Sequence, residues 1–512
     1  LVGACSYLLI GFDTHNPKAA RAATQAFWVN RVADVALIAA LGLLWAQYQS
    51  LSFSTLLASG QPAPSVWVGA LLLVGAMGKS AQIPFQGWLP DAMTGPTPVS
   101  ALIHAATMVA AGVFLLVRAY PLLAPPVLLA ATVVGVLTAV VGSVLALRQW
   151  ELKRVLAFST VAQLGYMVAA VGLGAPHLAL LHLLTHAAFK AGLFLVAGSV
   201  QHAVHVAADG LGVSHAEGDL RALGGLWRQL PITFAVASVA IAALVGLPLT
   251  AGFLSKDAIL LQALWVAPAA GALLVFAAAL TAYYSLRWLA MVFLGPPRMP
   301  KPLAAQVREA SGWQRAPLVL LGVASLALLY VPLAGLVGLR PPAMAEGHAL
   351  VLEGWLWATL GFGQLVAALL VYRAYRTGAL WQGAGLVFEL GFPTLYRWLF
   401  GAISGLSRLA GGVERYVVGG LLAVVQRVVV GFRPLHAELS LRTLADGIDR
   451  RVVDPAVNAL AEGLLRSGRR LGVLQRGRVQ RYLAYTLVGL VLVVALVLGW
   501  RSGQSFAPLL PN

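Results

Sequence analysis

The sequence predicts an all-α polytopic membrane protein, a bundle of helices that crosses a lipid bilayer several times. Hydrophobic residues make up 60% of the chain and charged residues 10%, with a mean hydropathy of +0.83, a composition outside the range of soluble domains. Apolar runs near the ~20 residues that a spanning helix needs recur along the chain. Lys and Arg fall in the loops between these runs, so the net charge of +17 indicates membrane orientation rather than nucleic-acid binding.

The chain opens inside an apolar helix. Leu1 starts the run LVGACSYLLIGF without an initiator methionine or a signal-peptide n-region, so we expect a truncated N-terminus and an incomplete first helix. After a polar loop, the next helix is predicted over residues 23–47, where the spacing of Arg31 and Asp34 suits a local, structural ion pair. Cys5 is the only cysteine, which excludes an intramolecular disulfide and any multi-cysteine cluster.

The stretch over residues 71–118 carries the strongest functional signal. An apolar helix pattern contains Lys79, breaks at Pro84 and resumes, after a proline-rich turn, as a second apolar helix that holds His104. A charge near the bilayer centre costs about 2.5–3.5 kcal/mol on insertion scales, so such residues normally face a bundle interior and mark a transport path. Broken helices at membrane depth survive only when they are buried in protein or line a wet cavity. The stretch therefore predicts half of an ion channel.

The central helices are predicted to carry a row of titratable side chains. A charged turn opens a helix with Lys153 near its start. The helix that begins at about residue 177 places His182, His186 and Lys190 at positions i, i+4 and i+8, on one face. We expect these three groups to line one wall of a path. Residues 201–230 follow as a solvated loop, whose histidines do not form a metal-ligand motif with other side chains.

The second half of the chain repeats the pattern of the first. The span over residues 231–261 is interrupted at residues 246–252 and holds Lys256 and Asp257 beyond the interruption. A lysine beside a broken helix thus occurs in each half, as in transporters built from structural repeats, so each half should hold its own half-channel. Further spans are predicted over residues 127–147, 271–294, 316–339 and 350–372.

Three regions follow from these patterns. Residues 1–373 are expected to form the transmembrane core. Residues 374–481 mix apolar residues with recurrent arginine, which is typical of helices that lie along a membrane interface or against other proteins, and the positive-inside rule places this lateral segment on the cytoplasmic face. Residues 482–501 are predicted to form a last transmembrane helix.

Four segments carry a specific resemblance: KSAQIPFQGWLPDAMTGPTPVSALIHAATMV, KRVLAFSTVAQLGYM, HLLTHAAFKAGLFLVAGSV and GFLSKDAIL. They resemble the antiporter-like proton-pumping subunits of respiratory complex I, the NADH:quinone oxidoreductase. The resemblance covers most of residues 1–372. The long amphipathic segment followed by a last span is similar to the distal L subunit, of the chain 5 type, whose lateral helix runs beside its sister subunits.

The resemblance implies a multi-pass subunit of a bacterial inner (plasma) membrane enzyme, with no redox site in this chain. It implies that partner subunits bind NADH, FMN, iron–sulfur clusters and quinone, and that this chain binds no cofactor and no metal. The implied partners are the lipid bilayer and the other membrane subunits, of the M, N, K and J types, contacted through the lateral helix. In this family the broken-helix lysine, here Lys79, pairs with a glutamate on an earlier helix, which would precede Leu1.

A path for protons follows as a hypothesis. Lys79 holds the proton of the first half-channel, and relay groups lead to an exit in the second half. The relay comprises His104, His182, His186 and Lys190, the exit is Lys256 with Asp257 as its neighbour, and Lys153 lies toward the cytoplasmic uptake side.

Structural interpretations of the same residues remain open at the level of sequence. His104 can be a core histidine, the polar face of the helix after residue 177 can be hydrogen-bond glue between helices, and Lys153 and Lys256 can face lipid headgroups. Two other functions also remain: a subunit of a Mrp-type cation/proton antiporter, and a membrane scaffold that does not pump. The sequence leaves open the quinone type and whether the coupling ion is a proton or sodium.

Overall fold

The computed structural model describes residues 2–13, 15–57, 64–310, 312–326, 330 and 346–376. These residues form helices and two isolated β-bridges, so the prediction of an all-α chain is confirmed for them. In this part of the chain, six helices are long and apolar enough to cross a membrane by length and composition. The lateral segment predicted over residues 374–481 falls almost wholly outside the described residues, and the predicted last helix over residues 482–501 does so completely.

The first half of the bundle is built around the predicted helix break. Its helices are α1 (Val2–Ile10), α2 (Pro17–Tyr48), α3 (Phe53–Leu56), α4 (Val66–Lys79), α5 (Trp88–Asp91), α6 (Thr97–Ala105), α7 (Met108–Arg118) and α8 (Pro125–Leu147), with short 3₁₀ turns η1 (Ala92–Thr94) and η2 (Tyr120–Leu122). The second half comprises α9 (Leu152–Gly172), α10 (Pro176–Leu211), α11 (Pro231–Val245), α12 (Ala251–Val266), α13 (Pro268–Val292), α14 (Lys301–Gln306), α15 (Gly312–Ala324) and α17 (Glu346–Arg376).

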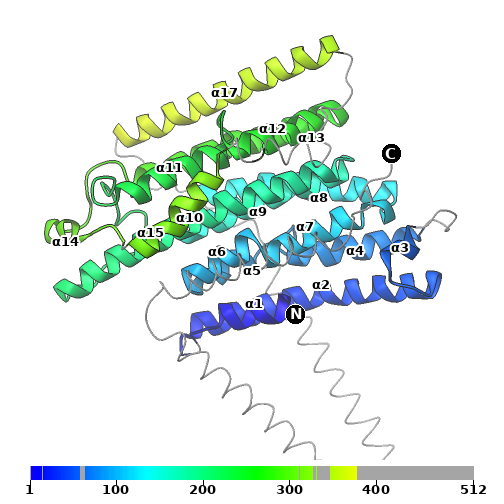
Figure 1. Cartoon of the computed structure of the whole chain (residues 1–512), viewed down its shortest axis with the longest axis horizontal. Helices are drawn as coiled ribbons and strands as arrows, with labels where there is room; N and C mark the ends of the chain where they lie inside the picture. The colour runs from blue at the N-terminus through cyan, green and yellow to red at the C-terminus, as the bar shows by residue number, and fades with distance from the viewer. Residues whose placement is uncertain are drawn as a thin grey trace, which may run out of the picture. The chain divides into compact units, whose positions relative to one another are not determined.

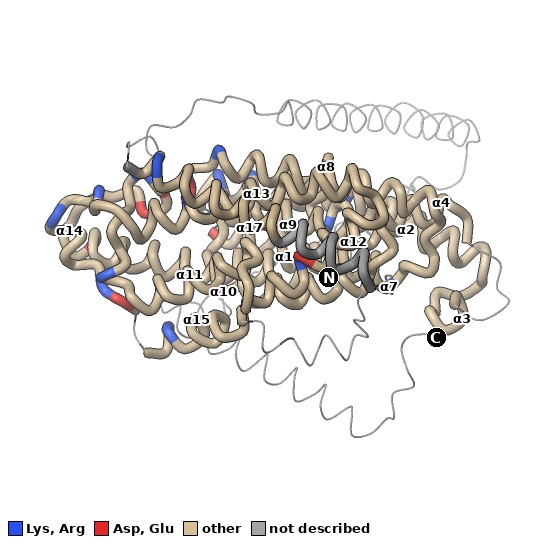
Figure 2. Tube along the Cα trace, turned by 90° about the horizontal axis from the view of Figure 1, so that it is seen from above, with Lys and Arg blue, Asp and Glu red and all other residues tan. Residues whose placement is uncertain are grey.

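The helices lie side by side in roughly chain order, from α1 and α2 along one edge to α17 along the other (Figure 1). Helix α9 occupies the middle of this arrangement, because it packs against α8, α10, α12 and α13 and almost all of its residues are buried. Many of the lysines and arginines gather at the end of the bundle where α14 lies (Figure 2). Helix α9 therefore has almost no side that could face lipid.

Glycines let α8 and α9 approach closely. A Cβ at Gly135 would lie 2.3 Å from the Ala169 nitrogen, and one at Gly165 would lie 2.5 Å from the Ala139 nitrogen. Neither contact can be relieved by moving a side chain, since the opposing atoms belong to the backbone. This small-residue seam is the packing that membrane helices use in place of a hydrophobic driving force, and it fixes α9 in the centre of the bundle.

Three predicted helix boundaries were wrong. Helix α15 ends at Ala324, so the span predicted over residues 316–339 is interrupted there. Helix α2 begins at Pro17, six residues before the predicted start, because the Asn16 side chain accepts a hydrogen bond from the Lys18 nitrogen and proline suits the first helical turn. Helix α10 continues to Leu211, so the first part of the predicted loop 201–230 is helical. At ~1.5 Å per residue its 36 residues span about 54 Å, more than the ~30 Å hydrocarbon core, and its polar last turns therefore extend beyond the apolar layer.

Candidate proton path

The first break places Lys79 at the carboxyl end of α4, against α2. The Lys79 Nζ atom lies 2.7 Å from Oδ1 of Asp34, and the side chains of this pair are only 13% and 18% exposed. Arg31 also pairs with Asp34, at 3.5 Å. The interpretation of Asp34 as a purely structural partner of Arg31 is therefore incomplete. Within the described residues, Asp34 supplies a counter-charge for Lys79.

Close packing of α2 on α4 brings this pair together. A Cβ at Gly78 would lie 2.2 Å from Cβ of Ala33, so glycine is needed beside Lys79 for Asp34 to reach it. The backbone of α1 also passes nearby, since a Cβ at Gly3 would lie 3.2 Å from Nζ of Lys79. The position of Lys79 in the last turn of α4 is favourable as well, because the unpaired carbonyls of a helix end attract a cation.

His104 lies beside a further helix interruption, between α6 and α7, that the sequence did not predict. The helix expected to hold it is divided into α6 and α7 at residues 106–107, where the Thr107 hydroxyl donates to the Leu102 carbonyl at 3.0 Å. The His104 side chain is fully buried, and its ring centroid lies 4.6 Å from that of Phe194 on α10. Neither ring nitrogen has a hydrogen-bond partner in the structure, which is unlike a histidine that serves only as a satisfied core residue.

The predicted face of α10 does come together as a buried polar row. His182, His186 and Lys190 are all fully buried. The Lys190 ammonium donates to the Leu156 carbonyl at 3.2 Å and to the Ser159 hydroxyl, both on α9. The ring nitrogens of His186 have no partner in the structure. The face of α10 therefore points into the bundle toward α9.

His182 links three helices. Its Nδ1 atom lies 2.9 Å from Oγ of Ser255 on α12, and its Nε2 atom lies 3.1 Å from Oε1 of Gln163 on α9. The Ser255 hydroxyl is also 2.7 Å from that of Thr185. Sequence analysis missed Gln163 and Ser255. Both could have been identified as polar residues inside apolar helices. Ser255, in addition, directly precedes Lys256.

The second break places Lys256 inside the bundle. Helix α11 ends at Val245 and is followed by Gly246, which has a φ of +88°. Helix α12 begins at Ala251, within the predicted interruption. Lys256 is 1% exposed, so it does not face lipid headgroups. Its Nζ atom donates to the Leu244 carbonyl in the last turn of α11 at 3.4 Å and lies 5.3 Å from the centroid of the Tyr166 ring.

Lys79 and Lys256 both lie near the carboxyl end of a half-helix, although their positions in sequence relative to the helix break differ. Lys79 ends the first half-helix of its break, whereas Lys256 follows its break by several residues and reaches back to the end of the first half-helix. Each ammonium therefore meets the negative end of a helix dipole. Asp257 is largely buried beside the break, since a Cβ at Gly246 would lie 3.4 Å from its Oδ1 atom.

Lys153 lies near the start of α9, at the end of the bundle that holds the basic loops. It is 8% exposed and donates to the Gly95 carbonyl at 3.1 Å, so it is not a snorkelling surface lysine. The neighbouring Arg154 pairs with Asp91 at 3.0 Å. Burial raises the pKa of the Glu151 carboxyl just before α9, while the positive charges of Lys153 and Arg154 lower that pKa in part.

The buried groups form a row across three helices. The ring centroids of His182 and His186 lie 6.2 Å apart on α10, and Lys190 follows one turn later. His104 of α6 packs against Phe194 of α10, and Ser255, which contacts His182, directly precedes Lys256 in α12. The row therefore runs from α6 through α10 to α12. Lys79 stands apart from it, on the α2 side of the bundle.

Comparisons with known proteins identify relatives of the chain. A family model described as the transmembrane part of NADH:quinone oxidoreductase and Mrp antiporters matches residues 1–281. The chain is 40% identical over 514 residues to NADH-quinone oxidoreductase subunit L of Mycobacterium tuberculosis, an alignment that covers 97% of this chain and 75% of the relative. It is also 40% identical over 436 residues to subunit L of Escherichia coli, covering 78% of this chain and 66% of that protein.

A solved structure gives the same result for the fold. The structure of the Mrp complex from Dietzia sp. contains a chain with a TM-score of 0.65 and 30% sequence identity. The match covers 86% of the present chain and 50% of the Mrp chain. The family resemblance and the antiporter-like helical fold that the sequence predicts are thereby confirmed.

Proposed function

Since the chain belongs to the NADH:quinone oxidoreductase/Mrp antiporter family of transmembrane proteins, we propose that it is the proton-translocating, L-type membrane subunit of an NADH:quinone oxidoreductase. It works as one membrane subunit of a larger complex. The protons move through buried lysines and histidines, and the energy comes from quinone reduction in other subunits. Moving one proton against the potential costs about 2.3 kcal/mol per 100 mV.

The observation that carries this proposal is the buried row that joins His104, Lys190, His186, His182 and Lys256. Burying several titratable groups in one bundle is costly, and a scaffold gains nothing from that cost. Proton transport, in contrast, requires a series of buried groups that each bind and release a proton. The unpartnered ring nitrogens of His104 and His186 are places where water can join neighbouring groups of the row.

Asp34 is placed to control the proton held by Lys79. The Asp34 carboxylate, 2.7 Å from the ammonium, supplies its counter-charge. If Asp34 moves toward Arg31, its second partner, Lys79 loses that counter-charge. The His104 row then relays protons toward Lys256 with Asp257 beside it, and Lys153 serves the uptake side.

Redox cofactors belong to partner subunits in this proposal. NADH, FMN, the iron–sulfur clusters and quinone are bound elsewhere in the complex, and this chain binds none of them. The neighbouring partners are membrane subunits of the M, N, K and J types, contacted through the lateral segment of residues 374–481. The complex lies in the inner membrane of a bacterium. The relatives named subunit L support this assignment.

A second function, that of a Mrp-type cation/proton antiporter subunit, is favoured by the likeness to the Mrp complex. The two functions differ in their energy source. The oxidoreductase subunit moves protons only when NADH is oxidised, whereas an antiporter exchanges cations for protons in vesicles without NADH. Measuring sodium-dependent proton flux in the absence of NADH therefore separates them.

The proposal is tested with Lys79→Ala in the full-length gene. We expect NADH-driven acidification of membrane vesicles and coupled NADH:quinone turnover to fall while the complex keeps its size, because the first proton-holding group is gone. Lys301→Ala, which removes an exposed lysine at the start of α14, is the matched control and should leave both rates unchanged. Parental rates in an intact Lys79→Ala complex would contradict the role of Lys79.

A further inference from the structure

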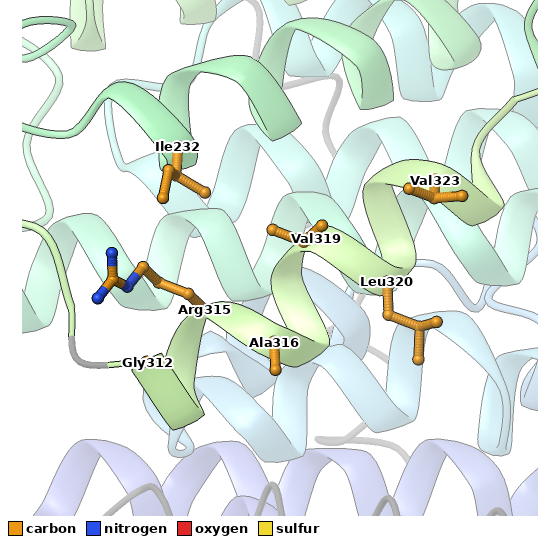
Figure 3. Close-up of a pocket in the computed structure, with 7 residues that line it drawn as sticks. All are labelled: Ile232, Gly312, Arg315, Ala316, Val319, Leu320 and Val323. Carbon is orange, nitrogen blue, oxygen red and sulfur yellow. The ribbon is translucent and has the colours of Figure 1, made fainter.

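An apolar groove lies between α11 and α15 on the outside of the bundle (Figure 3). On the α15 side, Val319, Leu320 and Val323 are 42%, 51% and 48% exposed, so the groove is open to the surroundings of the bundle. In a membrane those surroundings are lipid. The lining residues are Ile232, Gly312, Arg315, Ala316, Val319, Leu320 and Val323.

Arg315 is the one charged residue in this lining. Its side chain reaches from α15 toward the part of α11 that carries Ile232 (Figure 3). The Nε atom is buried and has no hydrogen-bond partner in the structure, which is an unfavourable state for a buried polar group. A guanidinium presents several N–H donors in a plane, which suits the oxygens of a phosphate.

The surroundings of Arg315 place it at the level of lipid headgroups. Trp313 is 82% exposed, and tryptophan concentrates where the hydrocarbon meets the headgroups. Two exposed basic residues precede α15, Lys301 at the start of α14 and Arg308 in the loop that follows it, and α14 lies at the end of the bundle where lysines and arginines gather (Figure 2). From Arg315 to Val323 the groove follows α15 for about 12 Å into the apolar layer.

Glu309, in the loop before α15, is engaged with the start of α11. The Glu309 carboxylate accepts hydrogen bonds from the backbone nitrogens of Ile232 and Thr233, at 2.9 and 3.2 Å, and from the Thr233 hydroxyl at 2.5 Å. It therefore caps the start of α11. Arg315 forms no ion pair with it, or with any other acid in the described part of the chain. The guanidinium charge remains available to an anion from outside.

We propose that this groove binds an anionic phospholipid of the bilayer. The phosphate accepts hydrogen bonds from Arg315, and one acyl chain lies along Ile232, Val319 and Val323. Basic side chains beside membrane helices on the cytoplasmic side favour anionic headgroups in this way. The site is separate from the buried row and requires no change in it.

The test uses the assembled complex from cells that carry the full-length gene, reconstituted in nanodiscs. The discs contain a small fraction of phosphatidylglycerol with a photoreactive diazirine in one acyl chain, or of phosphatidylcholine with the same chain. After irradiation, mass spectrometry measures the lipid attached to residues 312–323. We expect phosphatidylglycerol to label these residues more strongly than phosphatidylcholine.

Three variants test the two parts of the site. Arg315→Gln should lower phosphatidylglycerol labelling by about fivefold, as expected for the loss of one basic residue at an anionic surface. Val319→Trp fills the groove and should lower labelling by both lipids. Arg308→Gln removes an exposed arginine outside the lining and is the matched control, with labelling at the parental level. Complex size is measured for each variant.

Several results would overturn the proposal. Equal labelling by the two lipids would mean that no headgroup is recognised. An equal loss with Arg308→Gln and Arg315→Gln would mean attraction by the basic loop as a whole. Absence of label from residues 312–323 in the parental complex would mean that protein, not lipid, covers the groove.

Discussion

At the scale of single residues, the pairing of Lys79 with Asp34 is the feature that most changes the interpretation of the sequence. The Arg31–Asp34 spacing suggested a local ion pair, and the structure contains that pair at 3.5 Å. The shorter contact, 2.7 Å, is to Lys79 from a different helix. Asp34 thus lies between two cations, an arrangement in which a small shift of one carboxylate changes the charge near a proton-binding lysine.

We predict that Asp34→Asn lowers NADH-driven proton pumping severalfold in an intact complex. The substitution keeps the size of the side chain and removes its charge, so the Lys79 ammonium loses its carboxylate partner. Arg31→Gln is the matched control, because it removes the outer partner, whose side chain is 47% exposed, and should have a smaller effect. Pumping is measured as acidification of vesicles. An equal loss in both variants would show that the Arg31–Asp34 pair, not the Lys79–Asp34 pair, matters.

At the scale of helices, glycines allow pairs of helices to approach closely, and this closeness determines which side chains come into contact. The small-residue seam between α8 and α9 places a nearly fully buried helix in the centre of the bundle. The contact of Gly78 with Ala33 does the same for α4 and α2 at the Lys79 site. A methyl group added at such a point forces the backbones apart, and overpacking of this kind costs about 1–3 kcal/mol.

We predict that Gly78→Ala reduces pumping and the yield of assembled complex. The new Cβ would lie 2.2 Å from Cβ of Ala33, so α2 must move away from α4 and carry Asp34 with it. The double variant Ala33→Gly/Gly78→Ala removes the opposing methyl group and should restore much of both quantities. Complex yield is read from native gels and pumping from vesicles. A double variant no better than Gly78→Ala would contradict this explanation.

At the scale of the whole bundle, the buried row joins the two halves of the chain. His182 is its junction, since it contacts Gln163 of α9 and Ser255 of α12 while lying on α10. Helices α9, α10 and α12 thus share one hydrogen-bonded group, the His182 ring. In the proposed function, this row is the path of protons from His104 toward Lys256.

We predict that the double variant Gln163→Leu/Ser255→Ala lowers pumping while the complex stays intact. Both partners of the His182 ring are lost, so its nitrogens are no longer held toward α9 and α12. Ser238→Ala is the matched control: it removes a hydroxyl that bonds only to the Phe234 carbonyl of its own helix, and pumping should stay at the parental level. Parental pumping in the double variant would remove His182 from the path.

The helical membrane fold, the two lysine-bearing breaks and the polar face of α10 were predictable from sequence alone. These features depend on local patterns: apolar runs, glycine and proline interruptions, and the i, i+4, i+8 spacing of one helix face. The family resemblance depends on the same local segments. The boundaries of α2 and α10 were predicted less accurately. The asparagine cap of α2 is only a weak signal in the sequence, and so is the extension of α10 beyond the length of a single membrane span.

Only the tertiary structure decided which groups meet. Asp34 and Lys79 lie on different helices, and their contact depends on the closeness that Gly78 permits. Gln163 and Ser255 belong to the row because α9 and α12 pack on either side of His182. Spacing along a chain fixes the face of one helix, but the neighbour of that face is set by how the helices pack, and packing is a property of the assembled bundle.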